Sequence, residues 1–405
     1  MANAHRPVNE RSLYDALARY RAIVPGSWNE FMAYAQSPQP VTVWRNAPRI
    51  GHDAFTAWME EYEGVAARTV AWDPRLYRLA ATVQPSTDHS PMGRPPTDRP
   101  ARADNSGPGA EDRSRERDDR SRESEGRRGG PEGRAARVKP GNLLAFGAGL
   151  YHVQEETAAM PAVLLSRSDR AAGISAGGGD TVETAGGAAG GTAEEAGGGV
   201  RILDLCAAPG NKSAQLAQMI RPAGTVVAND VNERRLRSGV PTWERLGLTN
   251  IAGTVYDGRN FPQLHHAFHA VLVDAPCTGE GTCRRNPGAL RDTSDAFRRR
   301  LTETQAALLR RAVELCKPGG RIVYCTCTFA PEENEEQIHA LLQDEIGEMV
   351  VPEPVNLEGI AGSPGIDYWN GRTLNPGVQQ ALRIWPHQND TGGFFIAALR
   401  KAASS

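Results

Sequence analysis

RILDLCAAPGNKSAQLAQMI, residues 201–220, decides the fold of this chain. RILDL is rich in the β-branched and apolar residues of a buried strand, and SAQLAQMI carries apolar residues at helical spacing. The intervening CAAPGNK is built of small residues and predicts a tight loop between them. It lacks the GxGxxG pattern of dinucleotide-binding loops, although its small side chains still allow a ligand to approach the backbone. Strand, loop and helix in this order predict one unit of a parallel α/β sheet.

The same alternation continues to the end of the chain. Further strands are expected at TVVAND, NIAGTVYD, AVLVDAP, RIVYCTC and GFFIAALRK. Helices are expected at 232–246, ETQAALLRRAVELC and EENEEQIHALLQ. Residues 200–402 are therefore predicted to form a doubly wound, mostly parallel sheet that binds its ligand at the carboxyl ends of the strands.

Two segments upstream have compositions that cannot bury a core. Residues 101–134 contain nine Arg, nine Asp or Glu and only three apolar residues, all Ala, so we expect 85–137 to be a disordered charged insert. Residues 171–199 contain 11 Gly and 8 Ala, which predicts a flexible linker. A solvated spacer is favoured over an RNA-binding tail for the first segment, because its acids cancel its arginines.

The remaining upstream pieces predict a small α+β region. In residues 1–84, Ser12 is expected to cap a helix that reaches Val24, followed by a strand at 41–44 and a helix at 53–63. Residues 138–170 are expected to complete this region with a short extended run and an apolar helix, and to lead into the α/β domain at 200–402.

Composition excludes several classes of protein. No run of 18 apolar residues exists, and the charged first 30 residues lack a secretory signal, so we expect a cytoplasmic protein without a membrane partner. Six Cys in 405 residues are too few for a disulfide scaffold. The net charge of −2 divides into zero for 101–134, −4 for the linker and +2 for the rest, so any nucleic-acid binding must use a local groove.

Acids and thiols follow the predicted strands. Since parallel strands end at one edge of a sheet, these side chains are expected to line one crevice. Asp230 follows the first loop by about 20 residues, the position from which a carboxylate binds a ribose diol. Without pyrophosphate-binding glycines, S-adenosylmethionine fits this crevice better than NAD. The strand-end residues are Asp204, the loop Cys206–Lys212, Asp230, Asp257, Asp274 with Cys277, and Cys327.

Long motifs give a specific resemblance. DLCAAPGNKS, DAPCTGEG and YCTCTFAPEENEEQI are similar to segments of the Sun-type (Nop/Nol/Sun, Fmu-like) RNA cytosine-5 methyltransferase family. GLYHVQEETAAMPAVLL and TGGFFIAALRK resemble further segments, so the resemblance runs from about 138 to 401, interrupted by the linker. It implies a Rossmann-like methyltransferase domain with a small N-terminal α+β RNA-facing domain. Asn211 departs from the family, where Gly is more common, and Thr278 and Thr328 stand where Ser is frequent.

The resemblance also implies roles for individual residues. Cys327, in Thr-Cys-Thr, would be the nucleophile, and Cys277 would help to release the product. Asp230 would bind the ribose of S-adenosylmethionine, Asp257 would lie by its adenine, and Asp274 would lie near both cofactor and target base. The methionine part would contact Cys206, Ala207, Ala208, Pro209, Gly210, Asn211 and Lys212.

Chemistry explains why two thiols are useful. Carbon 5 of cytosine is a poor nucleophile, and a thiolate that adds to carbon 6 makes an enamine that can attack a methyl donor. A general base near Cys277 must then remove the carbon-5 proton before the thiol is eliminated. Lys212 is expected to lower a thiol pKa through its charge, and the base must be unpaired or flipped out.

Other interpretations remain open. A zinc site is disfavoured because Cys277-x5-Cys283 and Cys325-x-Cys327 lack the usual spacing, so no metal is expected. Cys206 and Cys316 are interpreted as buried packing residues, and Cys325 as packing with a redox role as the lesser alternative. The rivals to an RNA methyltransferase are a DNA cytosine-5 methyltransferase that attacks from Cys277, and a non-catalytic RNA-binding or ribosome assembly protein. The expected partner is rRNA or tRNA, and the protein is expected to be a monomer.

Overall fold

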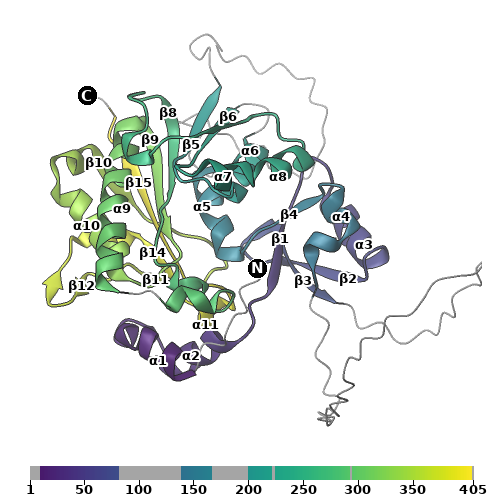
Figure 1. The fold of residues 1–405 in the computed structure, drawn as a ribbon, viewed down its shortest axis with the longest axis horizontal. Helices are drawn as coiled ribbons and strands as arrows, with labels where there is room; N and C mark the ends of the chain where they lie inside the picture. Colours follow the sequence, from purple (N-terminus) through teal and green to yellow (C-terminus); the bar gives the residue numbers. More distant parts are fainter. Residues whose placement is uncertain (1–9, 82–137, 167–198, 221–223, 292–293, 404–405) are drawn as a thin grey trace, which may run out of the picture. The chain divides into compact units, whose positions relative to one another are not determined.

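The computed structural model describes residues 10–81, 138–166, 199–220, 224–291 and 294–403. The predicted charged insert at 85–137 and nearly all of the linker predicted at 171–199 lie outside these residues. Figure 1 shows the elements in sequence colours. The described residues form a four-stranded sheet near the N-terminus and a larger nine-stranded sheet.

The larger sheet confirms the predicted doubly wound α/β fold. Its strands lie in the order β11-β14-β15-β9-β8-β5-β6-β7, and β10 pairs with β15. The five adjacent strands β9, β8, β5, β6 and β7 run parallel to one another, whereas β15 is antiparallel to β9. The strands are β5 Val200–Asp204, β6 Gly224–Asn229, β7 Ile251–Thr254, β8 Phe268–Asp274, β9 Cys316–Thr326, β10 Val350–Glu353, β11 Ser363–Pro364, β14 Leu382–Ile384 and β15 Phe394–Lys401.

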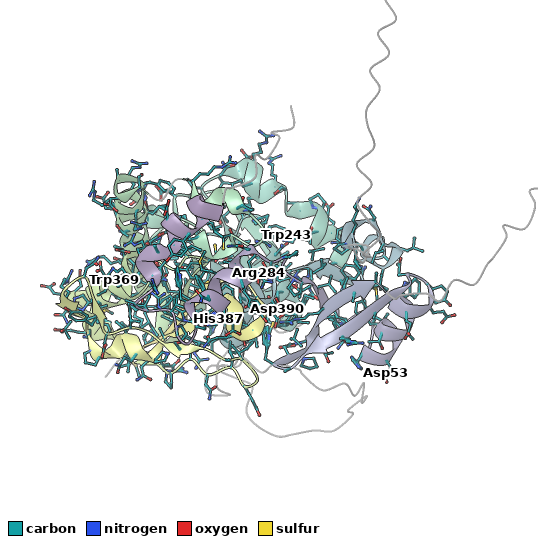
Figure 2. The ribbon with its side chains drawn as sticks, turned by 90° about the horizontal axis from the view of Figure 1, so that it is seen from below. Asp53, Trp243, Arg284, Trp369, His387 and Asp390 are labelled. Atoms are coloured by element: carbon teal, nitrogen blue, oxygen red, sulfur yellow. The ribbon has the colours of Figure 1, made fainter. Side chains whose placement is uncertain are left out.

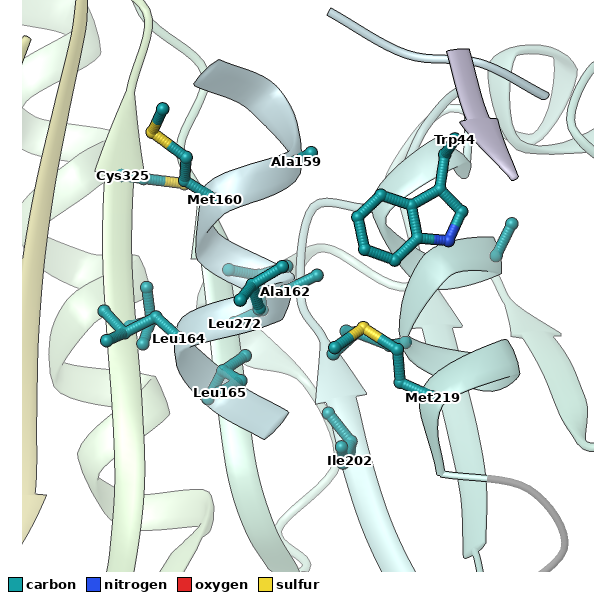
Figure 3. Close-up of a cluster of buried hydrophobic side chains, with 14 of the residues drawn as sticks. Trp44, Ala159, Met160, Ala162, Leu164, Leu165, Ile202, Met219, Leu272 and Cys325 are labelled. Carbon is teal, nitrogen blue, oxygen red and sulfur yellow. The ribbon is translucent and has the colours of Figure 1, made fainter. Parts of the chain in front are cut away.

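Helices cover both faces of this sheet because successive strand residues point to opposite sides. Ile202 and Leu272 face a core built with α5 Glu156–Ser166 and α6 Asn211–Met219. Leu203 and Val271 face a second core built with α9 Asp295–Leu315 and α10 Glu335–Gln343. Figure 3 shows the first core, in which Trp44 packs beside the helices that cover the sheet.

The smaller sheet joins segments from both sides of the charged insert. It has the order β2-β3-β1-β4, with antiparallel pairing throughout. β1 Val41–Arg45, β2 Val65–Val70 and β3 Asp73–Ala81 precede the insert, and β4 Tyr151–Val153 follows it. With α3 His52–Glu61 and α4 Leu144–Gly147, these strands form the α+β region that the sequence predicts.

The first two helices pack on the larger sheet's loops. Tyr20 and Phe31 bury their rings against Phe329 and Trp385 in a shared apolar cluster. Figure 1 shows these helices, α1 Glu10–Leu17 and α2 Trp28–Gln36, next to α11 Pro386–Asn389. The N-terminal residues therefore contact loops at the carboxyl edge of the larger sheet.

Two predicted helices are wrong in detail. α1 begins at Glu10 and ends at Leu17, so Ser12 lies within the helix and is not its cap, and the chain does not continue as a regular helix to Val24. The predicted helix at 232–246 is two helices, α7 Glu233–Arg237 and α8 Val240–Leu246. Pro241 cannot donate the hydrogen bond that would continue α7, and a proline ring clashes with the preceding turn.

Among the described residues, no helix is both long enough and apolar enough to cross a bilayer.

Candidate active site

Strand order places the predicted site residues along one edge. Across the sheet from β9 to β7, the strands are followed by Cys327, Asp274, Cys206, Asp230 and Asp257. Because β5 pairs with β6 on one side and β8 on the other, the chain direction of the connections reverses here. Doubly wound sheets bind ligands in the crevice at such a reversal.

Cys277 and Cys327 are in direct contact. Their sulfurs lie 3.5 Å apart, although the residues are 50 positions apart in the chain. The hydrogen bond from Cys277 lowers the pKa of the Cys327 thiol, while burial opposes this shift. The same contact, together with burial, raises the pKa of Cys277. The pair therefore consists of one thiol favoured as a thiolate and one held protonated as its donor.

Asp274 is held between a cation and a third thiol. Lys212 Nζ donates to Asp274 Oδ2 at 2.6 Å, and Cys325 Sγ donates to Asp274 Oδ1 at 3.4 Å. Burial lowers the pKa of Lys212, but the neighbouring Asp274 carboxylate outweighs it and raises the pKa above its usual value. Lys212 is thus a fixed cation, and its charge also lowers the pKa of Cys327. Cys325 is fully buried and packs in the first core.

A cavity of about 120 Å³ opens beside these groups. Its volume is well below the roughly 300–1,000 Å³ of sites that enclose drug-sized ligands. Lys212, Asp274 and Cys327 line it together, so the predicted nucleophile and its charged neighbours share one space. Four segments of the chain form the remaining wall. Their residues are Gln39 before β1, Glu155, Thr157 and Ala158 at the start of α5, Gly281, Thr282 and Arg285 after β8, and Gly392, Gly393 and Phe394 at the start of β15.

The loop 206–212 wraps around the end of β5. Ala207 N donates to Asn229 O at 2.7 Å, which ties the loop to β6. Gly210 has φ +97°, and a Cβ there would lie 2.7 Å from the Trp243 ring, so only glycine fits this close turn. Asn211 Nδ2 donates to Val153 O at 3.3 Å. The residue that departs from the family pattern therefore links the loop to the smaller sheet.

The acids at the ends of β6 and β7 are held by nearby groups. Asp230 accepts from Ala208 N at 3.1 Å and from Asn232 N at 2.9 Å, and is almost fully buried. Asp257 is one-third exposed and pairs with Arg259, whose hydrogen bond lowers the pKa of the carboxyl. Asp230 adjoins the loop 206–212, whereas Asp257 lies at the far end of the row.

Asp204 is fully buried at the end of β5, and Cys206, two residues later, is half-buried. Ser213 donates to Asp204 Oδ2 at 2.6 Å, while Oδ1 has no hydrogen-bond partner. Burial raises the pKa of Asp204 to about 7, and burial also raises that of Cys206. Both residues are near Asp274 and Asp230, so the structure brings together all the predicted strand-end acids except Asp257.

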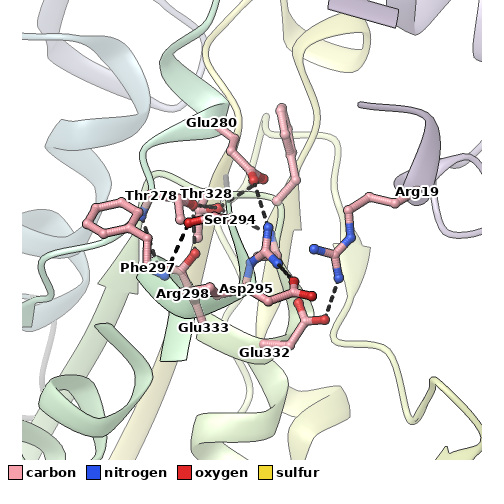
Figure 4. Close-up of polar contacts among 12 residues, drawn as sticks. Arg19, Thr278, Glu280, Ser294, Asp295, Phe297, Arg298, Thr328, Glu332 and Glu333 are labelled. Atoms are coloured by element: carbon pink, nitrogen blue, oxygen red, sulfur yellow. Dashed lines mark hydrogen bonds and ion pairs between the residues drawn. The ribbon is translucent and has the colours of Figure 1, made fainter. Parts of the chain in front are cut away.

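Sequence reasoning missed a set of polar residues behind the thiols. Figure 4 shows Thr278 and Thr328 between two buried carboxylates, Glu280 and Glu333. Glu280 also accepts from the Tyr20 hydroxyl and pairs with Arg298 at 3.5 Å. The signal was available, because Thr278 and Thr328 each follow a site cysteine directly.

Sequence reasoning also missed the consecutive residues Arg284 and Arg285. Arg284 is buried and binds the carbonyls of Thr391 and Pro38, and it pairs with Asp390, near which it lies in Figure 2. Arg285 is exposed and lines the cavity with Cys327. The first therefore joins loops to the N-terminal region, and the second presents a cation at the cavity.

The six cysteines form no disulfide, and among the described residues they belong to no group of metal ligands. All six thiols are free, and Cys283 is buried in the aromatic cluster of α1 and α2. Within the described part of the chain, no three His, Cys, Asp or Glu side chains are grouped as metal ligands. Cys316 is fully buried in the second core, which confirms its interpretation as a packing residue.

Known proteins resemble this chain in sequence. A ribosomal RNA small subunit methyltransferase F from Shewanella amazonensis is 32% identical over 269 residues, which are 66% of this chain and 49% of that protein. The human 28S rRNA (cytosine(4447)-C(5))-methyltransferase is 36% identical over 209 residues, or 51% of this chain and 25% of that protein. The chain thus spans about half the length of the bacterial relative and a quarter of the human one.

Solved structures share the fold. NSun6 from Pyrococcus horikoshii, determined with SFG, has a TM-score of 0.63 at 19% identity and covers 98% of this chain and 99% of its own. A methyltransferase homologue from the same organism has a TM-score of 0.62 at 23% identity, with 96% and 99% covered. At these identities the likeness concerns the fold alone.

A family model matches the C-terminal half of the chain. The family is described as 16S rRNA methyltransferase RsmB/F, and its match covers residues 194–400, half of the sequence. This match, with the relatives above, confirms the Sun-type resemblance. The chain belongs to the RsmB/F family of 16S rRNA methyltransferases.

Proposed function

We propose that this protein transfers a methyl group from S-adenosylmethionine to carbon 5 of a cytosine in ribosomal RNA. The observation that carries the proposal is the contact of Cys277 with Cys327, which itself lines a cavity together with Asp274 and Lys212. Two adjoining thiols match a reaction in which one adds to the base and the other assists its release. The names of the sequence relatives support ribosomal RNA as the substrate class.

Cys327 is the proposed nucleophile. Its thiol has the lowered pKa, so more of it is thiolate near neutral pH, and it lines the cavity. Attack on carbon 6 of cytosine would form the covalent Cys327–base bond and leave an enamine that reacts at carbon 5. Cys277 does not line the cavity, whereas Cys327 does, which disfavours the DNA-methyltransferase mechanism that attacks from Cys277.

Asp274 and Lys212 are proposed to orient the base. Asp274 is suited to accept a hydrogen bond from the N4 amino group of cytosine, since its carboxylate faces the cavity. Lys212 holds this carboxylate at 2.6 Å and supplies a positive charge beside the developing negative charge of the adduct. Cys277 is proposed to assist, with a nearby general base, the loss of the carbon-5 proton and the elimination of Cys327.

The residues at the other end of the crevice fit a nucleoside methyl donor. The loop makes a tight turn of small residues at Gly210, and Asp230 retains lone pairs after accepting two N–H groups. We propose that Cys206–Lys212 hold the methionine part, Asp230 the ribose and Asp257 the adenine side. When bound, S-adenosylmethionine supplies the electrophilic methyl group.

The RNA is proposed to reach the cavity past Arg285. An exposed guanidinium at the rim can bind a phosphate next to the flipped-out base. Gln39, which precedes β1, and Glu155, which follows β4, line the same cavity, and this supports a role of the N-terminal region in holding RNA. A monomer in the cytoplasm remains the expected form of the enzyme.

The test is methyl transfer to purified rRNA that lacks 5-methylcytosine, with radiolabelled S-adenosylmethionine and detection of the modified nucleoside. The wild-type protein should form 5-methylcytosine at one or a few positions. Cys277→Ala should accumulate a protein–RNA adduct that denaturing gels resolve, and Cys327→Ala should form none. An adduct that survives Cys327→Ala, or a wild-type protein that methylates DNA instead, would contradict the proposal.

A further inference from the structure

Thr278 and Thr328 connect the two cysteine loops through their hydroxyls. The Oγ1 atoms lie 2.7 Å apart, and each residue directly follows one of the paired thiols. Both side chains are buried, with 7% and 1% exposed. The two cysteine loops are therefore joined by a hydrogen bond between the threonine hydroxyls as well as by the Sγ–Sγ contact.

Buried carboxylates hold each end of this bridge. Glu333 accepts from Thr278 Oγ1 at 2.6 Å, from Thr278 N at 3.0 Å and from Gln305 Nε2 at 2.9 Å. At the other end, Glu280 Oε2 lies 3.3 Å from Thr328 Oγ1 and also accepts from Tyr20. Figure 4 shows the two threonines between these carboxylates.

Counting protons assigns the direction of the bonds. Two hydroxyls carry two protons, but they make three contacts: Thr278 to Glu333, Thr278 to Thr328, and Thr328 to Glu280. The two short contacts are satisfied together only if Thr328 donates to Thr278 and Thr278 donates to Glu333. Thr328 Oγ1 then accepts from Ala330 N at 3.2 Å, and Glu280 is satisfied by Tyr20 and Arg298.

This direction makes Glu333 the anchor of both loops. Its carboxylate fixes the backbone of Thr278, next to Cys277, and through the Thr278 hydroxyl it fixes Thr328, next to Cys327. A backbone bond from Gly281 N to Cys327 O at 2.9 Å joins the same loops. A buried bond between parts of the chain 50 residues apart contributes only about 1 kcal/mol to stability, but it restricts geometry strongly.

We propose that the Thr328–Thr278–Glu333 bridge sets the separation of Cys277 and Cys327, and so acts as the positioning element of the thiol pair. The proposal rests on the proposed function for its catalytic meaning, but the thiol geometry it concerns is independent of any RNA. The bridge holds Cys277 within donor distance of Cys327. Its loss would let the sulfurs move apart and would leave Cys327 less reactive.

The experiment uses the full-length protein without RNA. Alkylation of Cys327 by iodoacetamide is followed by mass spectrometry as a function of pH, for the wild type, Thr328→Val, Thr278→Val and the matched controls Thr328→Ser and Thr278→Ser. Valine keeps the shape of threonine and removes the hydroxyl, whereas serine keeps the hydroxyl. Thermal melting establishes that each variant is folded.

The valine variants should shift the alkylation profile of Cys327 upward by about one pH unit, equivalent to about ten-fold slower alkylation at neutral pH. The serine variants should stay near the wild-type profile. Thr278→Val should have the larger effect, because it removes both short bonds. If Thr278→Val does not fold, Thr328→Val carries the test, since it removes only one of them.

Two results would overturn the proposal: valine variants with the wild-type profile, or serine variants shifted as far as valine. RNA methylation by the same proteins separates this question from the proposed function. Should the wild type methylate no RNA, the proposed function fails, while the alkylation profiles still decide whether the bridge positions the thiols. Methylation reduced in the valine variants and restored by serine would support both.

Discussion

The two ends of the carboxyl edge are built differently. At the β8–β9 end, the polar contacts join distant residues: Cys277 to Cys327 across 50 positions and Lys212 to Asp274 across 62. At the β6–β7 end, Asp257 binds Arg259 and Asp230 binds Asn232, each two residues away, and Asp230 also accepts from Ala208 N in the loop after β5. Local turns hold most of the second kind of site, while the first requires the whole sheet to be assembled. We therefore expect substitutions at the thiol end to have the larger effects.

The largest effect is expected for Cys327→Ala. Removing the nucleophile should lower kcat by at least about 10³-fold, as for other enzymes that lose a covalent nucleophile. S-adenosylmethionine binding, measured by calorimetry, should be unchanged, because the β6–β7 end is held by its own local contacts. Residual turnover above a few per cent would show that the thiol end is not where the reaction occurs.

Cys277 should divide the reaction into two stages. Cys277→Ala removes the proton donor to Cys327, so the pKa of Cys327 should rise and adduct formation should begin at higher pH. Loss of assistance to release should lower turnover by about 10²-fold or more and leave the adduct trapped. Cys277→Ser, which keeps a donor, is the matched control and should restore the pH profile of adduct formation. An unshifted profile in Cys277→Ala would mean that the sulfur contact does not set the reactivity of Cys327.

Lys212→Gln tests the charge at the thiol end. Without the ammonium, Asp274 loses its 2.6 Å partner and Cys327 loses a nearby positive charge. We expect kcat to fall by about 10- to 100-fold, equivalent to about 1.4–2.7 kcal/mol. The midpoint of Cys327 alkylation should move to higher pH. Lys212→Arg keeps the charge, and equal losses in both variants would argue for a role in shape alone.

Arg285→Gln should affect RNA more than chemistry. Loss of one phosphate contact should weaken RNA binding several-fold and reduce the slope of log affinity against log salt by about 0.7–1. Nitrocellulose filter binding at several salt concentrations measures both. Because Arg284 beside it is buried and structural, it is unsuitable as a control, and exposed Arg237 on α7 serves instead. An unchanged salt slope in Arg285→Gln would place the RNA elsewhere.

The smallest effect is expected at the far end of the edge. Asp257→Asn removes a charge that is one-third exposed and already paired with Arg259. The KM for S-adenosylmethionine should rise by about two- to five-fold, equivalent to about 0.4–1 kcal/mol, with kcat nearly unchanged. A loss as large as that of Lys212→Gln would remove the contrast between the two ends.

The sequence predicted the elements that depend on local pattern. The strands RILDL and AVLVDAP and the helix at SAQLAQMI are present as β5, β8 and α6, since strong periodicity and flanking loop residues specify them. The helix expected at 232–246 is two helices because Pro241 cannot continue the hydrogen bonds of α7, and this signal also lies in the sequence. Only the tertiary structure shows that Gly239, between the two helices, lies against the Pro209 carbonyl, where a Cβ would be 2.0 Å away.

The site divides in the same way. The sequence by itself determined which residues end the strands. Because parallel strands have their carboxyl ends at the same edge of a sheet, it also determined that these residues share one edge. It also determined the family, through motifs that are continuous in the chain. Only the tertiary structure decided that Cys277 contacts Cys327, that Thr278 contacts Thr328 and that Glu333 accepts a hydrogen bond from Thr278. The physical reason is that hydrogen bonds need positions defined to a few tenths of an ångström, and residues 50 apart acquire them only after the sheet and its two cores have packed.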